Sequence, residues 1–294
     1  RLKDTLVFSR ADSGGVDQQI TYAAFEDEKP VLSGAVPITS WSLLSDHPER
    51  LPEAARGRVW VADVGFLRKI DRQQAPAVTV ATQEDRGWRF FALYQDGNRL
   101  PRARGPGFSP TRTFPRGSRD RQTVYFPGQT IKNWPDLANA ELMIVPQHYW
   151  VRNILPLESV DETRGIAQTK YHGTYPLGRN GMRDRDAAWV ENVLGVLDKP
   201  GEWVLDARQA RLYFWPFEAG PPRDVVVPLL TELIRVEGDI DYAGPVDKPV
   251  RGLKFHGLTF SQADRFCWHG RTGWGLQHDW ERFDSPSAML RLRG

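Results

Sequence analysis

Side chains suited to binding chemistry gather in one stretch near the carboxyl end of the chain, residues 264–286. This stretch contains Trp268, His269, Trp274, His278 and Trp280. Indole faces can stack on flat apolar surfaces, including the apolar side of a sugar ring, and imidazoles can hydrogen-bond hydroxyl groups. Long loops in compact proteins are often functional. We therefore take these five residues as candidate substrate-binding residues.

The same loop also has plainer interpretations. The three tryptophans could simply pack the loop onto the rest of the fold, and Asp264 follows an apolar alternation where a turn residue is expected. His269 and His278 have no third ligand at an established spacing, and no dense aspartate cluster suggests calcium. The sequence therefore predicts no metal site and no cofactor.

Arg99, Arg102 and Arg104 alternate along a second stretch and would form a basic strip. Such a strip could contact an acidic ligand, or it could protect an exposed strand edge against unwanted pairing. Both interpretations stay open at the level of sequence.

Composition limits the other classes of function. The 294 residues have a formal net charge of +2, which gives no sign of nucleic-acid binding, and hydrophobic residues at 40% can supply a sizeable core. A single cysteine, Cys267, excludes an internal disulfide framework and any multi-cysteine metal site. No run of about 18 apolar residues is present, so we predict no membrane span.

The elements that would position the loop are short strands, because 26 glycines and 22 prolines divide the chain into brief segments. Apolar residues alternate around Leu6, Tyr22 and Val31, and three short strands with turns between them fit one coil of a solenoid. The same texture returns over 233–237, 253–260 and 289–292. A solenoid tolerates long insertions because each coil contacts only its neighbours.

Residues 37–228 have a different texture. Asp96 and Gly97 form a hairpin signal, and strand-like runs occur at 59–61, 123–126 and 142–145. We predict an antiparallel β-barrel or sandwich. Apolar residues at helical spacing from Trp189 to Leu197 also predict one short helix over 186–198, followed by a hairpin that joins 203–205 to 212–215.

Several phrases together resemble glycoside hydrolase family 141. They are ITYAAF at 20–25 with KPVLSG at 29–34, NRLPRAR at 98–104, ENVL at 191–194, PGEWVLD at 200–206, LYFWP at 212–216, and PVRGL at 249–253 with GLTF at 257–260. Their order and spacing cover most of the chain. Two departures are Ala210, where a turn glycine is expected, and residues 267–284, which do not match.

The resemblance implies an all-β fold: a right-handed parallel β-helix, represented by its first coils and interrupted by the insertion. Its boundaries would be 1–36 for the first coil, 37–228 for the β-rich insertion domain and 229–294 for the continuing coils, with truncation at both ends. The resemblance places the catalytic carboxylates beyond residue 294, so no catalytic residue is assigned and this fragment is expected to be inactive alone.

The implied function is that of a bacterial glycoside hydrolase acting on plant or algal polysaccharide, with the insertion bracing the substrate groove. The protein would be a secreted or periplasmic monomer. One alternative is a β-helix polysaccharide lyase, which would use a Lys or Arg base and often calcium. A second is a noncatalytic carbohydrate-binding surface protein.

Overall fold

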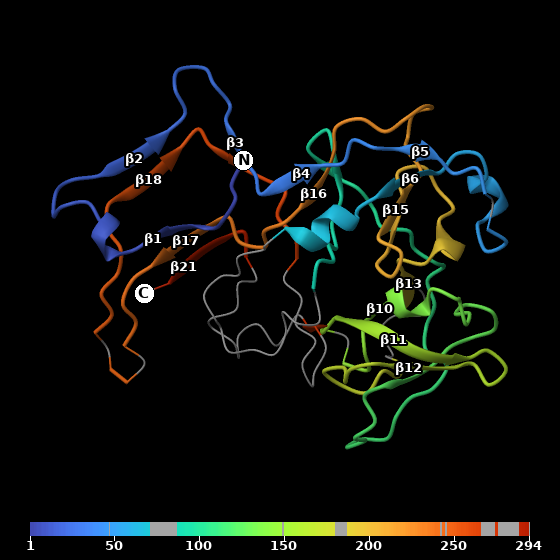
Figure 1. Cartoon of the computed structure of the whole chain (residues 1–294). Helices are drawn as coiled ribbons and strands as arrows, with labels where there is room; N and C mark the ends of the chain where they lie inside the picture. The colour runs from blue at the N-terminus through green and yellow to red at the C-terminus, as the bar shows by residue number, and fades with distance from the viewer. Residues whose placement is uncertain are drawn as a thin grey trace.

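The computed structural model describes residues 1–46, 48–70, 87–148, 150–179, 187–241, 243–244, 246–265, 274–275 and 288–293. The described residues form β-strands and short 3₁₀ helices, and the longest helix among them has five residues. Figure 1 shows two parts side by side, one built of parallel strands that contains both chain ends and one built of antiparallel strands.

The parallel part consists of three ladders that join the two ends of the chain. In the first, β1 (Leu6–Phe8) pairs with β17 (Ile234–Glu237), which pairs with β21 (Leu290–Arg293). In the second, β2 (Ile20–Ala23) pairs with β18 (Leu253–His256), and in the third, β3 (Val31–Leu32) pairs with β19 (Thr259–Phe260). The strands β1, β2 and β3 therefore lie beside β17, β18 and β19, in the same order.

Aromatic rings pack between these ladders. The rings of Phe8, Tyr22 and Phe255 lie with their centroids 5.2 to 5.5 Å apart, and Ile234 and Val236 pack in the same cluster. Aromatic pairs in such geometry add about 0.5–1.5 kcal/mol beyond their burial. The apolar alternation of the two segments thus forms one shared core.

The chain leaves and returns to the parallel part through one antiparallel pair, β4 (Ala35–Pro37) and β16 (Val225–Pro228). Strand β16 also pairs with β7 (Tyr94–Gln95), which forms a hairpin with β8 (Asn98–Arg99). Asp96 and Gly97 have φ values of +50° and +77°. Two successive positive φ values are typical of a type I′ turn, so the predicted Asp-Gly hairpin is confirmed.

A second antiparallel sheet has the order β14 (Trp203–Asp206), β15 (Arg211–Phe214), β6 (Trp60–Asp63) and β5 (Ser42–Leu43). The predicted hairpin of β14 and β15 is present. Its turn includes Ala210 at φ +55°, a conformation that favours glycine, which explains why glycine is expected there. Alternate residues of this sheet, such as Val204 and Leu205, belong to two different cores, so both of its faces are buried.

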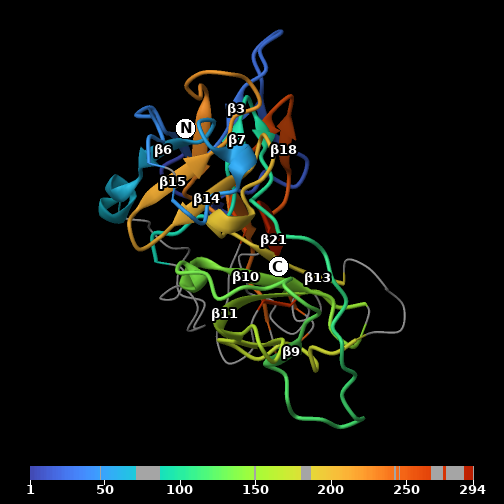
Figure 2. The same cartoon turned by 90° about the vertical axis from the view of Figure 1, so that its right-hand side faces the viewer.

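A six-stranded sheet packs against one face of this four-stranded sheet (Figure 2). It contains β13 (Ala188–Glu191), β10 (Glu141–Ile144), β11 (Asn153–Asp161), β12 (Ile166–Thr169) and β9 (Thr123–Tyr125), with β20 (Trp274–Gly275) added beside β11. The antiparallel strands of the described residues are stacked as layers and close into no barrel. The barrel form of the prediction is therefore wrong. The four-stranded sheet has two apolar faces, and other layers cover both of them, so the sheet does not close on itself.

The remaining elements are 3₁₀ helices: η1 (Arg10–Asp12), η2 (Glu53–Ala55), η3 (Gly65–Lys69), η4 (Leu137–Asn139) and η5 (Leu194–Val196). The predicted helix over 186–198 is wrong. Its described part contains β13, whose buried and half-buried residues alternate, followed by Asn192 at φ +65° and the single turn η5. The apolar spacing therefore arises from a strand and a turn that bury residues in succession, not from one helical face.

Candidate functional site

The structure describes only a few residues of the predicted aromatic loop and its ends. Trp268, His269, His278 and Trp280 lie outside the described residues, and of Trp274 the structure describes the backbone. That backbone pairs with Ile154 of β11. Arg265, at the start of the loop, contacts Glu141, and Leu290, after the loop, pairs with Ile234. The fixed points of the loop therefore lie along the boundary between the parallel and antiparallel parts, which makes this boundary the candidate functional site.

Asp264 anchors the start of the loop. Its carboxylate is buried and accepts the backbone N–H of Phe91 at 3.1 Å through both oxygens, while its own N–H donates to Leu230. The neighbouring carbonyl of Ala263 accepts a hydrogen bond from the Tyr94 hydroxyl at 2.8 Å. These contacts hold the boundary together and match the turn role expected for Asp264.

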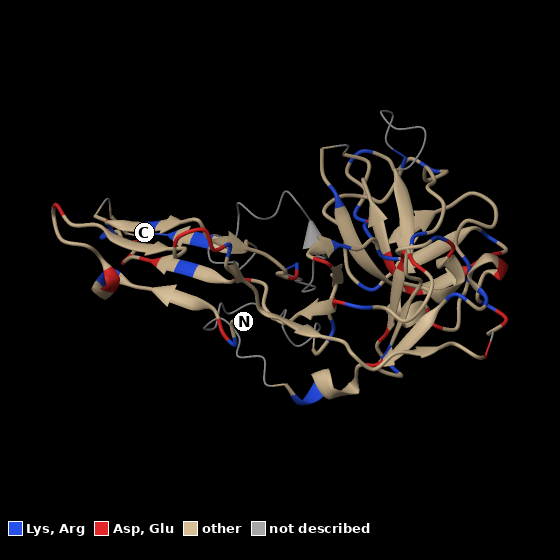
Figure 3. Ribbon diagram, turned by 90° about the horizontal axis from the view of Figure 1, so that it is seen from above, with Lys and Arg blue, Asp and Glu red and all other residues tan. Residues whose placement is uncertain are grey.

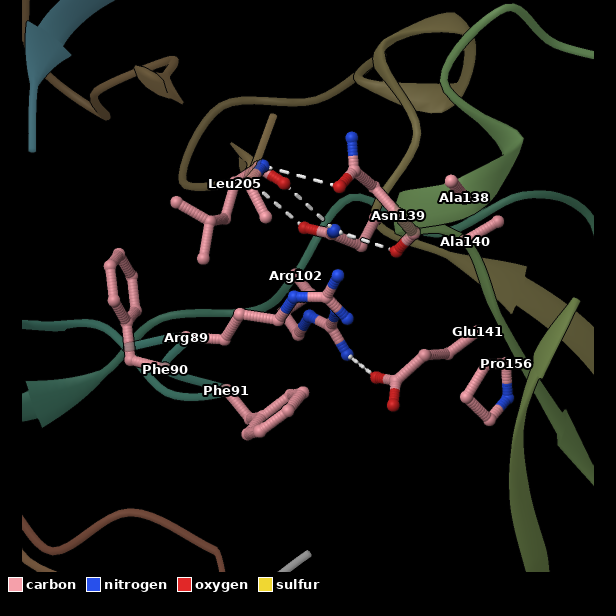
Figure 4. A pocket seen from close by; sticks show the side chains of 12 residues that line it. Arg89, Phe90, Phe91, Arg102, Ala138, Asn139, Ala140, Glu141, Pro156 and Leu205 are labelled. Atoms are coloured by element: carbon pink, nitrogen blue, oxygen red, sulfur yellow. Dashed lines mark hydrogen bonds and ion pairs between the residues drawn. The ribbon is translucent and has the colours of Figure 1, made fainter. Parts of the chain in front are cut away.

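Glu141, Arg102 and Arg265 form what we call the junction cluster. Glu141 accepts a hydrogen bond of 2.5 Å from Arg102 (Figure 4). It also accepts hydrogen bonds of 2.5 and 2.6 Å from Arg265. Arg102 also lies 3.4 Å from Glu191, and the Arg265 guanidinium lies 4.3 Å from the centroid of the Phe91 ring. The cluster thus joins β10 of the antiparallel part to the chain that leaves β19.

The electrostatics of the junction cluster exclude proton donation by Glu141 near neutral pH. Burial by itself would raise the pKa of Glu141, but the charges and hydrogen bonds of Arg265 and Arg102 outweigh it and lower the pKa to about 2. A general acid needs a pKa near the working pH. Glu141 therefore acts as a permanent anion that neutralises two buried cations.

The cavity beside the junction cluster is small. It is lined by Arg89, Phe91, Asn139 and Glu141 among others, and its volume of about 20 Å³ is room for about one water molecule. Ligand pockets usually measure ~300–1,000 Å³. This cavity is therefore part of the scaffold.

A second charged cluster, which we call the ladder cluster, lies on the first parallel ladder. In register, Arg235 of β17 stands beside Arg291 of β21, and Glu237 stands beside Arg293. Glu232 precedes β17 and lies 3.5 Å from the Arg235 Nε and 3.3 Å from Arg291. Figure 3 shows the resulting charged bands on neighbouring strands of the parallel part.

Glu232 and Glu237 are the two carboxylates of the ladder cluster. One oxygen of each carboxylate lies within 3.5 Å of the Arg235 Nε, so both carboxylates contact the same guanidinium. Burial raises the pKa of Glu232 in spite of the opposing charges of Arg291 and Arg235. However, Glu232 is only 1% exposed and Glu237 is paired with Arg293. In this conformation the cluster ties neighbouring strands together.

The three arginines of the predicted basic strip have different surroundings. Arg102 belongs to the junction cluster, the Arg104 guanidinium lies 4.0 Å from the centroid of the Trp189 ring, and Arg99 is exposed on β8. Sequence reasoning missed Glu141 and Glu232 because a lone glutamate in a short strand carries no motif.

Scaffold roles account for the unusual phrases at 191–194 and 200–206. The Asn192 side chain donates to the Leu205 carbonyl at 3.1 Å and accepts the Leu205 N–H at 2.8 Å, as a strand neighbour would. The Glu202 carboxylate accepts the N–H groups of Asp198 and Lys199, and burial raises its pKa.

Within the described part of the chain, no group of three or more His, Cys, Asp or Glu side chains could hold a metal ion. The described residues also contain no helix with the length and apolar character of a membrane span.

No family model matches the sequence, and no curated protein matches it. Among solved structures, a protein named "Glycoside hydrolase" superposes with a TM-score of 0.61 at 21% sequence identity. The match covers 91% of this chain and 44% of that protein, so the chain spans less than half the length of its structural neighbour. The chain is therefore all-β and has a glycoside hydrolase-like fold.

Proposed function

We propose that this chain is part of a carbohydrate-active glycoside hydrolase whose parallel strands are the first coils of a right-handed β-helix. The observation that carries the proposal is the pairing of the two chain ends in three parallel ladders in the same order. Successive coils of a solenoid produce this pattern, because each coil stacks its strands on those of the coil before. The glycoside hydrolase-like fold supports the same view.

In this proposal, residues 1–36 and 229–294 belong to the β-helix, and residues 37–228 are an insertion domain that braces the substrate groove. The closeness of β4 and β16 supports the division, since the insertion then leaves and returns at one place. The aromatic loop, with Trp268, His269, Trp274, His278 and Trp280, would contribute to the groove at the boundary of the two parts.

The proposed substrate is a plant or algal polysaccharide, which the protein would meet as a secreted or periplasmic protein. The catalytic carboxylates would stand on coils beyond residue 294. Because the neighbour is more than twice as long as the matched region, a longer protein offers room for such coils.

The test compares this chain with a form extended beyond residue 294 on fucosylated, xylan and pectic substrates. We expect the extended form to release reducing sugars and this chain to release none. Products that absorb as unsaturated uronates and disappear on chelation would point to a lyase instead. Saturable glycan binding without turnover by the extended form would indicate a noncatalytic binding protein.

A further inference from the structure

An arginine-rich segment precedes β9 in the antiparallel part. It contains Arg112, Arg116, Arg119 and Arg121, and all four are exposed. Arg112 stacks on a tyrosine ring, whereas the other three form no ion pair within the described residues. The one acidic residue among them, Asp120, is occupied by two backbone N–H groups of the following turn. The segment therefore presents uncompensated positive charge.

Beside this segment lies a cleft of about 250 Å³. Arg116 and Arg121 line it together with the rings of His148 and Tyr175, and Pro115 and Pro176 supply further apolar surface. None of the described residues that line the cleft is acidic. Its volume is slightly below the ~300 Å³ at the lower end of common ligand pockets, which suits a single ring with one or two substituents.

Three aromatic rings form a row from the cleft to the surface. The ring centroids of Tyr175 and His148 are 3.9 Å apart, those of His148 and Trp150 are 5.0 Å apart, and Trp150 is 55% exposed. An exposed indole beside a half-buried phenol offers the apolar faces on which sugar rings stack, with polar atoms at the edges.

The walls of the cleft are held by hydrogen bonds. The Gln147 side chain accepts a hydrogen bond from the Phe114 N–H and donates one to the Phe114 carbonyl, both at 2.9 Å. These bonds hold the arginine-rich segment beside residue 147. Asn153 exchanges bonds of 2.8 and 3.0 Å with Thr174, which fixes the neighbour of Tyr175. A preformed site loses less conformational freedom when a ligand binds.

We propose that this cleft binds one unit of an anionic saccharide, with the ring against the aromatic row and the acidic group beside Arg116 and Arg121. Guanidinium groups bind carboxylate and sulfate through paired hydrogen bonds, and the described residues of the lining include no carboxylate that would repel such a ligand. Sugar is preferred to nucleic acid because the cleft, at about 250 Å³, has the size of a single ring. This choice of a sugar rests on the proposed function.

The location supports a continuous path for a polymer. Asn153, which fixes one wall of the cleft, pairs in register with Gly275 of β20. The cleft thus lies next to the point where the aromatic loop is anchored, and a chain bound along the boundary of the two parts could extend into it.

The test is isothermal titration of the protein with polygalacturonate, sulfated galactan and neutral xylan at low salt. We expect at least one anionic polymer to bind more tightly than xylan; the carboxylated and sulfated polymers distinguish the two sources of negative charge. The double variant Arg116→Gln/Arg121→Gln should weaken that binding at least tenfold, which corresponds to ~1.4 kcal/mol. The matched control is Arg56→Gln/Arg251→Gln, which removes two exposed arginines elsewhere and should change binding less than twofold.

Trp150→Ala should also weaken binding, whereas Phe217→Ala, at another exposed aromatic residue, should not. Unchanged thermal unfolding would show that the variants are folded. Equal weakening by both arginine pairs, preference for xylan, or tighter binding of single-stranded DNA would overturn the proposal. Turnover by the extended protein is measured separately, so binding without turnover refutes only the hydrolase, and turnover without anionic preference refutes only this site.

Discussion

Replacing Glu141 by glutamine would keep the size of the side chain and remove the charge that Arg102 and Arg265 share. Folding lowers the pKa of Glu141 from 4.5 to about 2. Since each pKa unit corresponds to ~1.4 kcal/mol, the ionised carboxylate contributes about 3 kcal/mol to stability. Breaking a buried ion pair by removing one partner costs a similar amount, about 3–5 kcal/mol. We therefore expect Glu141→Gln to lower the free energy of unfolding by about 3 kcal/mol at pH 7.

The pH dependence gives the reasoning a sharper test. Because folding lowers this pKa, the stabilisation is fully present above pH 4.5 and is lost as the pH falls towards about 2. Urea unfolding followed by tryptophan fluorescence should show a large gap between wild type and variant at pH 7 and a clearly smaller gap at pH 3. Glu158→Gln, at an exposed position of β11, is the control. A loss below ~1 kcal/mol at pH 7, or an equal loss at both pH values, would refute the argument.

Three further changes probe other parts of the fold. Glu232→Gln should cost less stability at pH 7 than Glu141→Gln, because burial raises the pKa of Glu232, so its contribution is present below pH 4.5 and is lost as the pH rises. Thermal unfolding at pH 4 and 7 checks this, and a variant that loses as much stability as Glu141→Gln at pH 7 contradicts it. Asn192→Gly should cost about 2–3 kcal/mol, since three hydrogen bonds are lost. Asn192→Ala should cost ~1 kcal/mol more because of the positive φ, and urea unfolding that ranks the two variants equally would argue against strain there. Gly34→Ala should lower the free energy of unfolding by about 1–3 kcal/mol, because the new Cβ would lie 2.7 Å from the Leu230 side chain. Urea unfolding of the double variant with Leu230→Ala should show a smaller loss than the sum of the two single losses.

Much of the fold could be predicted from short-range patterns. The alternation around Leu6, Tyr22 and Val31 predicts strands that the structure contains, and Asp96-Gly97 predicts a hairpin through its backbone preference. These signals are local, because side-chain period and turn residues depend on a few neighbours in sequence.

The remaining features depend on contacts between distant residues. The apolar run from Trp189 to Leu197 fits a helix by spacing, yet pairing with β10 and the positive φ of Asn192 make it a strand and a turn. Glu141 and Arg265 are separated by 124 residues, so no motif connects them. Of the five candidate binding residues, the structure describes only the backbone of Trp274, and their role stays a prediction.

The antiparallel pairing of β4 with β16 puts residues 37 and 226 opposite each other. The chain therefore enters and leaves the antiparallel part at two points that are nearly 190 residues apart in sequence but adjacent in space. A change in length within residues 38–224 that keeps β4 and β16 paired would leave both of these points in place. The antiparallel part is thus attached by this one pair of strands at the crossing point and by the hydrogen bonds of Asp264 and the junction cluster beside it.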